Sequence, residues 1–239
     1  MQRFIFLLTL LIIAGCAEPP EATEPTPEPA PEAVTPDDLG ALGSDAVETL
    51  LEDEAIHVHR ITLAAGDSLA PHDGGERVVY AVSAIEALDF ITDSARETRS
   101  FEAGAVHSHE AGVHALANTG STPAELVVFE RRGTLSGEAT ESTDIPTPGE
   151  GTTDEVIFDN DFAEVHRVTL QPGAGLPPHR GYARAVYALT GYTVEFTGDD
   201  GAREERYDAG QAHAHAAGDH TVENAGTTVA EFLVVEFKR

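Results

Sequence analysis

The chain has 239 residues, 41% of them hydrophobic, and can therefore bury one large core or two small ones. Its 42 acidic side chains outnumber 14 basic ones and give a formal charge of −28, which opposes binding to nucleic acid, where Lys and Arg neutralise phosphate. We expect no nucleic-acid partner.

The first residues, MQRFIFLLTLLIIAGC, combine a basic start with a short apolar run. The run is too short for a comfortable membrane span and predicts a signal peptide over residues 1–15. Its end, from Ile13 to Cys16, resembles the lipobox of bacterial lipoproteins, in which the cysteine is acylated. The resemblance implies lipidation at Cys16, a membrane partner through that lipid, and a place in the cell envelope, on the periplasmic face of the outer membrane in a Gram-negative cell.

A segment rich in Pro, Glu and Ala follows, over residues 16–45. It has no basic or aromatic residue and cannot bury enough apolar surface to offset its ordering entropy, so we expect a disordered tether. The stretch DAVETLLED, residues 45–53, has the spacing of a short helix. A second segment with loop chemistry, residues 133–154, predicts a linker.

The rest of the chain contains two repeats. VHRITLAAGDSLAPHDGGERVVYA, from Val58, aligns without a gap with VHRVTLQPGAGLPPHRGYARAVYA, from Val165, and more than half of the positions are identical. A later pair of segments, which contain HSHEAGVH and HAHAAGDH, aligns as well. The duplication predicts two domains of the same fold, at residues 46–132 and 155–239.

Each repeat is a series of short runs of Val, Ile, Leu, Tyr and Phe, broken by turn signals such as HDGG and TGDDG. This spacing predicts an antiparallel all-β barrel or sandwich. The runs VVYAV and EFLVVEF are apolar on both faces, which is typical of central strands. We expect two jelly-roll barrels in tandem.

The stretches LPPHRGYARAVYALTG, from Leu176, and DAGQAHAHAAGDHTVEN, from Asp208, resemble the two motifs of the cupin superfamily. In that family the first motif carries a His-x-His pair and a glutamate, and the second carries a histidine and an asparagine. The resemblance covers nearly all of both repeats and implies a bicupin with metal-binding barrels. The positions that match the motif histidines and the closing asparagine are His179, His220 and Asn224 in the second repeat and His72, His114 and Asn118 in the first.

Both repeats depart from the family at two of its four ligand positions. Ala70 and Pro177 stand where the first histidine of the pair would be. Arg77 and Arg184 fall where the glutamate would be, and a guanidinium cannot ligate a metal. These arginines could instead contact an anionic ligand, and the alternative is a structural ion pair within the acidic chain.

Each repeat also has a further His-x-His pair. Residues two apart on a strand point to the same face, so His213 and His215 would project together, and the Ala-Gly turn would bring His220 toward them. Neutral imidazoles suit divalent transition metals, and the candidates are Zn, Fe, Mn, Ni and Cu. The candidate ligands are His72, His107, His109, His114, His179, His213, His215 and His220. The alternative is that these histidines only cap turns, since duplication copies a decorative residue as faithfully as a functional one.

Two other histidines recur in the motif VHR. His59 and His166 each alternate with aliphatic residues on one face, which predicts satisfied core histidines. The sequence has no GxSxG elbow, no phosphate-binding glycine loop and no CxxC, and its one cysteine belongs to the signal. Catalysis by a cysteine nucleophile is therefore excluded.

Three functions are compatible with these features. The missing family ligands favour an envelope-tethered bicupin that binds a divalent transition metal or a small-molecule ligand in histidine-lined barrel mouths. The runner-up is a metal-dependent cupin enzyme, such as a dioxygenase, that acts on a small organic acid at an open coordination position. The third is a structural or interaction module, because fold does not imply activity.

Overall fold

The computed structural model describes residues 39–92, 94–133 and 147–238. The predicted signal peptide, the lipidation site Cys16 and nearly all of the predicted tether lie outside these ranges. Within them, no helix has the length and apolar character needed to cross a bilayer.

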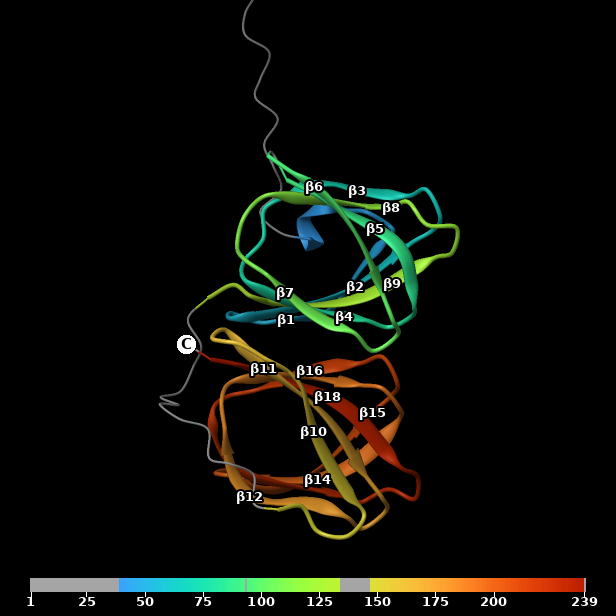
Figure 1. The fold of residues 1–239 in the computed structure, drawn as a ribbon. Coiled ribbons are helices and arrows are strands. Elements are labelled where there is room, and N and C mark those ends of the chain that lie inside the picture. The colour runs from blue at the N-terminus through green and yellow to red at the C-terminus, as the bar shows by residue number, and fades with distance from the viewer. Residues whose placement is uncertain (1–38, 93, 134–146, 239) are drawn as a thin grey trace, which may run out of the picture. The chain divides into compact units, whose positions relative to one another are not determined.

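The first repeat folds into a barrel of two antiparallel sheets, which we call the first barrel (Figure 1). One sheet has the order β1-β2-β9-β4-β7 and the other the order β3-β8-β5-β6. The strands are β1 (Val47–Glu52), β2 (Ile56–Leu63), β3 (Ser68–His72), β4 (Arg77–Ala81), β5 (Ile85–Ile91), β6 (Arg96–Phe101), β7 (Val106–His109), β8 (His114–Asn118) and β9 (Ala124–Arg131).

The second repeat forms the second barrel with the same strand order (Figure 1). Its sheets are β10-β11-β18-β13-β16 and β12-β17-β14-β15, so each strand of the first barrel has one counterpart. The strands are β10 (Thr152–Asp159), β11 (Ala163–Leu170), β12 (Gly175–Gly181), β13 (Arg184–Ala188), β14 (Tyr192–Gly198), β15 (Gly201–Tyr207), β16 (Ala212–His215), β17 (Gly218–Asn224) and β18 (Ala230–Phe237). The prediction of two tandem all-β jelly-roll barrels is confirmed.

The runs that are apolar on both faces form central strands, as predicted. In β4, Val79 and Ala81 pack into the core of the first barrel, while Val78 and Tyr80 face the opposite way, into a second cluster. That cluster also contains residues of β13 and β18, among them Tyr187. Alternation along a strand therefore explains why these runs have no polar face.

The predicted short helix over residues 45–53 is wrong, because these residues form β1 instead. The pairing of β1 with β2 shifts between Thr49 and Leu51, which marks a β-bulge. The extra residue changes the alternation and leaves Val47, Leu50 and Leu51 as the partly buried apolar positions. Their spacing of three and four imitates one face of a helix.

Two predicted boundaries also differ from the structure. Within the expected tether, Leu39 is buried and is followed by a 3-10 helix, η1 (Gly40–Leu42), because Leu39 and Leu42 pack against the core of the first barrel. Within the expected linker, β10 already begins at Thr152.

Candidate functional site

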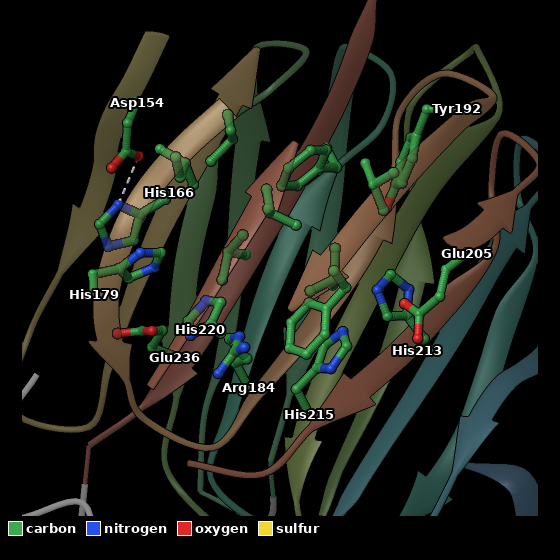
Figure 2. Close-up of a pocket in the computed structure, with 18 residues that line it drawn as sticks. Asp154, His166, His179, Arg184, Tyr192, Glu205, His213, His215, His220 and Glu236 are labelled. Atoms are coloured by element: carbon green, nitrogen blue, oxygen red, sulfur yellow. Dashed lines mark hydrogen bonds and ion pairs between the residues drawn. The ribbon is translucent and has the colours of Figure 1, made fainter. Parts of the chain in front are cut away.

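A pocket of about 600 Å³, open solvent at its mouth included, lies between the two sheets of the second barrel. Figure 2 shows its side chains, which come from both sheets, and labels the polar ones. Its lining residues within the described ranges all belong to strands of this barrel: Asp154, His166, Val168, Leu176, His179, Arg184, Val186, Tyr192, Val194, Phe196, Glu205, His213, His215, His220, Val222, Phe232, Val234 and Glu236. The four histidines that the sequence singled out in this repeat all face the same space.

His213 and His215 project from β16 into this pocket, with ring centroids 5.0 Å apart. Alternation along the strand gives them the same face, as the sequence predicts. Aromatic rings hold both imidazoles. His213 stacks on Tyr207 at 3.7 Å between centroids, and His215 stacks on Phe196 at 4.6 Å.

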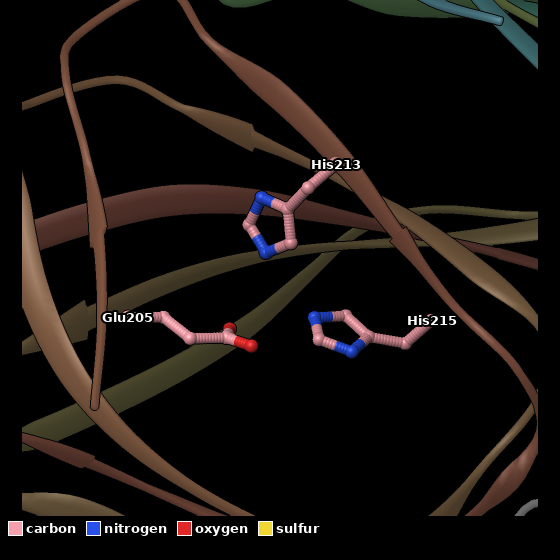
Figure 3. Close-up of side chains that lie close together, drawn as sticks. All are labelled: Glu205, His213 and His215. Carbon is pink, nitrogen blue, oxygen red and sulfur yellow. The ribbon is translucent and has the colours of Figure 1, made fainter. Parts of the chain in front are cut away.

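Glu205, from β15, completes a group that could hold a metal ion (Figure 3). One carboxylate oxygen of Glu205 and one ring nitrogen from each of His213 and His215 all lie within 4.8 Å of one another. Among the described residues, these three form the one group in which at least three possible metal ligands lie this close together. The sequence analysis did not predict Glu205.

The carboxylate of Glu205 is oriented by two neighbours. The hydroxyl of Tyr207 donates a hydrogen bond of 2.7 Å to Oε2, and Nε of Arg203 donates to Oε1. Burial opposes ionisation of Glu205, but these hydrogen bonds outweigh it and hold its pKa below the ordinary value. The group therefore offers a negatively charged oxygen at neutral pH.

The two histidines of the group are neutral at the same pH. Burial, together with the nearby charge of Arg184, lowers the pKa of His213 to about 4 and that of His215 to about 2. Nδ1 of His213 is buried and has no hydrogen-bond partner in the described part of the chain. A buried orphaned nitrogen is costly unless something binds it, and a metal ion would do so.

His179 and His220 form a second pair in the same pocket, with ring centroids 4.1 Å apart. They are cross-strand neighbours on β12 and β17. Nδ1 of each ring lies near a carbonyl oxygen, that of Pro177 at 2.8 Å and that of Gly218 at 3.2 Å. When Nδ1 donates in this way, Nε2 carries the free lone pair, which is the tautomer of many metal-bound histidines.

A cationic side chain, that of Arg184, lines the pocket together with His179 and His220. Arg184 is buried on β13, and Nη1 donates to the carbonyl oxygens of Tyr182 and Ala216. Burial lowers its pKa to about 10, so it remains charged at neutral pH. Its cross-strand partner is Glu236, whose pKa is raised by burial. The charge of Arg184 opposes a cation between His179 and His220.

His166 lines the pocket and is bonded to Asp154 (Figure 2) and to a second carboxylate, that of Glu164. Nδ1 lies 2.9 Å from Oδ1 of Asp154, and Nε2 lies 3.0 Å from Oε1 of Glu164. Burial disfavours its charged form, but the bond to Asp154 outweighs burial and raises its pKa. The prediction of a satisfied histidine is confirmed for His166, and with both nitrogens engaged it offers no free lone pair.

The first barrel repeats the histidines without the carboxylate. The ring centroids of His107 and His109 lie 4.9 Å apart, and the ring of His107 stacks on that of Phe101. Register places Arg99 opposite Leu88 in β5, as Glu205 lies opposite Val194 in β14. The cation Arg99 thus replaces the carboxylate, and neither ring nitrogen of His107 has a hydrogen-bond partner within the described residues.

The remaining first-barrel candidates follow the second barrel. His72 and His114 form a pair whose ring centroids lie 4.1 Å apart, as those of His179 and His220 do. Arg77 is buried opposite Glu130 and lines a smaller pocket with His109 and His114. The sequence-predicted histidines thus come together within each barrel as a strand pair and a cross-strand pair.

The closing asparagines are structural clamps. Nδ2 of Asn224 donates to the carbonyl oxygens of Leu170 and Thr228, at 2.9 and 2.8 Å, and its Oδ1 accepts from the amide of Gly226. Asn118 binds the carbonyls of Leu63 and Thr122 in the same way. The hydrogen bonds of both asparagine side chains therefore serve to fix neighbouring loops.

Two donor sets can therefore be compared as metal sites. The set at the family's ligand positions keeps two histidines but has Arg184 where a carboxylate is needed, and it does not fit a cation. The set Glu205, His213 and His215 has a charged oxygen, two neutral imidazoles and an orphaned nitrogen, and it fits a divalent transition metal.

No protein-family model matches the sequence, and no curated protein matches it. Solved structures match through their fold. AerE from Microcystis aeruginosa is 13% identical, with a TM-score of 0.56 over 81% of this chain and 98% of its own. Oxalate decarboxylase from Bacillus subtilis, described with Mn(II) centres, is 14% identical, with a TM-score of 0.58 over 80% of this chain and 75% of its own.

A cupin 2 conserved barrel domain protein from Leptotrichia buccalis is also similar, at 14% identity over 80% of this chain and 88% of its own, with a TM-score of 0.48. At such identities the likeness of AerE and oxalate decarboxylase shows the fold alone. That fold is two jelly-roll barrels in one chain.

Proposed function

We propose that this chain, with its two cupin barrels, binds one divalent transition metal ion in the second barrel through Glu205, His213 and His215. The observation that carries the proposal is the convergence of one carboxylate oxygen and two imidazole nitrogens within 4.8 Å, from three half-buried side chains that line one pocket. Acidic clusters on a surface are common without a metal, whereas this group contains two neutral imidazoles and a single carboxylate.

The donor set narrows the choice of metal. A set of two nitrogen ligands and one oxygen ligand suits Zn, Fe or Mn. It suits them better than a set of thiolates alone or of oxygens alone would. The Mn(II) centres of the similar oxalate decarboxylase agree with such a metal in this fold. Tyr207 and Arg203 would act as the groups that orient the carboxylate.

The second candidate function is catalysis on a small organic acid. Three protein donors leave at least one coordination position open, which a water or a substrate can take. Arg184 lies in the same pocket and remains charged, so it could pair with a carboxylate of the substrate. These two features favour an enzyme over a purely structural metal site.

The metal content per chain tests the proposal, measured by elemental mass spectrometry on protein purified without a metal-binding tag. We expect about one tightly held ion per chain in the parent and none in Glu205→Gln or His213→Ala. Glu204→Gln is the matched control, because Glu204 is the exposed neighbour on the same strand. An unchanged metal content in Glu205→Gln would refute the assignment of this ligand.

The proposal includes attachment to the cell envelope through Cys16. The lipobox-like end of the apolar run supports it. In a bacterial host, a fatty-acid analogue should label the parent chain and leave Cys16→Ser unlabelled. Labelling of both would place the modification elsewhere.

A further inference from the structure

The pocket of the first barrel is filled by a residue from outside the barrel. Leu39, just before η1, is only 1% exposed and lines this pocket. The space in this pocket, open solvent at its mouth included, is about 270 Å³, against about 600 Å³ for the pocket of the second barrel. The other lining residues all lie on strands: Ile61, Arg77, Val79, Phe90, His109, His114, Leu116, Leu126 and Val128.

Every one of these strand residues has its counterpart in the wall of the second pocket. Sheet register supports the match: Arg77 pairs with His109 as Arg184 pairs with His215. The counterparts are Val168, Arg184, Val186, Phe196, His215, His220, Val222, Phe232 and Val234. Among the described residues, Leu39 alone has no counterpart, because those that line the second pocket are all strand residues of its own barrel.

The first barrel thus shows, within the same chain, what fits this kind of pocket. The isobutyl side chain of Leu39 lies among Ile61, Leu116 and Val128, with a buried arginine and two histidines in the same wall. The equivalent apolar wall in the second barrel, formed by Val168, Val222 and other residues, surrounds space instead. Apolar walls around space favour a ligand that brings hydrocarbon of its own.

We infer that the second pocket takes a small carboxylate with a short branched aliphatic chain. The hydrocarbon occupies the space that Leu39 fills in the first barrel. The carboxylate faces the polar part of the pocket, where Arg184 and the proposed metal ion both favour an anion. This inference rests on the proposed function, because it assigns a ligand class to the same pocket.

The probe is 4-methylpentanoate, in which one methylene group joins the isobutyl group of leucine to a carboxylate. Isothermal titration calorimetry of the metal-loaded protein should show about one molecule bound per chain, roughly 10- to 100-fold more tightly than acetate. The uncharged analogue 4-methylpentanamide should bind at least roughly tenfold more weakly than the acid. Equal affinities for 4-methylpentanoate and acetate would overturn the inference.

The duplication supplies a gain-of-binding test. Leu39→Ala removes the side chain that fills the first pocket, so about two molecules of 4-methylpentanoate should bind per chain. Leu42→Ala is the matched control, since Leu42 packs against the same core but does not line the pocket. A stoichiometry that stays the same in Leu39→Ala would contradict the equivalence of the two pockets.

A blocking variant tests the second pocket directly. Val222→Phe places a ring in the pocket wall and should abolish binding, whereas Val156→Phe, at an exposed valine of β10, should leave it unchanged. Because Val222→Phe could disturb the barrel, circular dichroism accompanies the titration, and the analogues and Leu39→Ala test the inference without that variant.

The same titrations separate this inference from the proposed function. If elemental analysis finds no metal but 4-methylpentanoate still binds more tightly than acetate, the metal assignment fails and the ligand class stands. If one ion is bound and the two acids bind alike, the ligand class fails and the metal site stands.

Discussion

Arg99 and Glu205 occupy equivalent positions in the two barrels. Arg99 pairs with Leu88, and Glu205 pairs with Val194, the counterpart of Leu88. The imidazoles beside both are held by stacked aromatic rings. The charge is also exchanged two residues earlier on each strand, where Glu97 lies opposite Phe90 and Arg203 lies opposite Phe196. Two exchanges of charge on one strand therefore separate a barrel that could bind a cation from one that could not. The duplication therefore contains its own control for the metal site.

Arg99→Glu should create a metal site in the first barrel. It removes a cation and places a carboxylate beside His107 and His109, so the metal content should rise from about one to about two ions per chain. Ser100→Glu adds one carboxylate at the exposed neighbouring position, without removing a cation, and should bind no additional ion. A second ion in both variants would show that added negative charge alone is sufficient for metal binding. No second ion in either variant would show that the geometry of the two barrels differs.

Tyr207→Phe should weaken metal binding without abolishing it. Its hydroxyl orients Glu205, and loss of such an orienting contact typically lowers metal affinity about 10- to 100-fold. The stacking on His213 is kept, since Phe101 performs it in the first barrel. Competition with a chromophoric chelator measures the change. An unaltered affinity would show that the hydroxyl plays no part in positioning the carboxylate.

Asn224→Ala should destabilise the protein without affecting the metal. The substitution leaves buried carbonyl oxygens without a donor, at a cost of about 1–3 kcal/mol in the free energy of unfolding. Denaturant unfolding measures the loss, with Glu223→Ala, at the exposed neighbour, as the control. Loss of metal in Asn224→Ala with unchanged stability would contradict the structural role of this family position.

The metal-free protein should lose stability as the pH falls below about 6.5, the ordinary pKa of histidine. Burial lowers the pKa of His107, His109, His114, His179, His213, His215 and His220 in the folded chain. The unfolded chain therefore binds more protons in this range, and each such histidine lowers the free energy of unfolding by up to about 1.4 kcal/mol per pH unit. His166, with a raised pKa, acts in the opposite sense.

Denaturant unfolding at a series of pH values from 7 to 5 measures this dependence. His107→Phe should reduce the slope by about one proton, because His107 lies buried between aromatic rings with a pKa of about 3. A free energy of unfolding that stays constant between pH 7 and pH 5 would contradict the burial of these imidazoles in neutral form.

Much of the site could be predicted from the sequence, because it depends on alternation and on duplication. His213 and His215 share a face because side chains alternate along a strand, and the repeat shows that the pair was copied with its domain. Glu205 could not be found in this way. It lies in a strand with several charged residues, where alternation does not tell an inward carboxylate from an outward one. The available signal was the difference between Glu205 and Arg99 in the aligned repeats.

The errors in the predicted elements also have physical causes. The bulge in β1 gave its apolar residues the spacing of a helix. Leu39 lies at the end of a segment whose composition predicts disorder, and composition does not reveal that a single leucine finds an apolar pocket in the barrel that follows.

The most direct test of the central claim is an anomalous difference map from crystals of the protein grown with Zn²⁺. The account predicts one peak in the second barrel, about 2.0–2.2 Å from an oxygen of Glu205 and from one ring nitrogen of each of His213 and His215, with no peak in the first barrel. A peak between His179 and His220, or an equal peak beside His107 and His109, would contradict it.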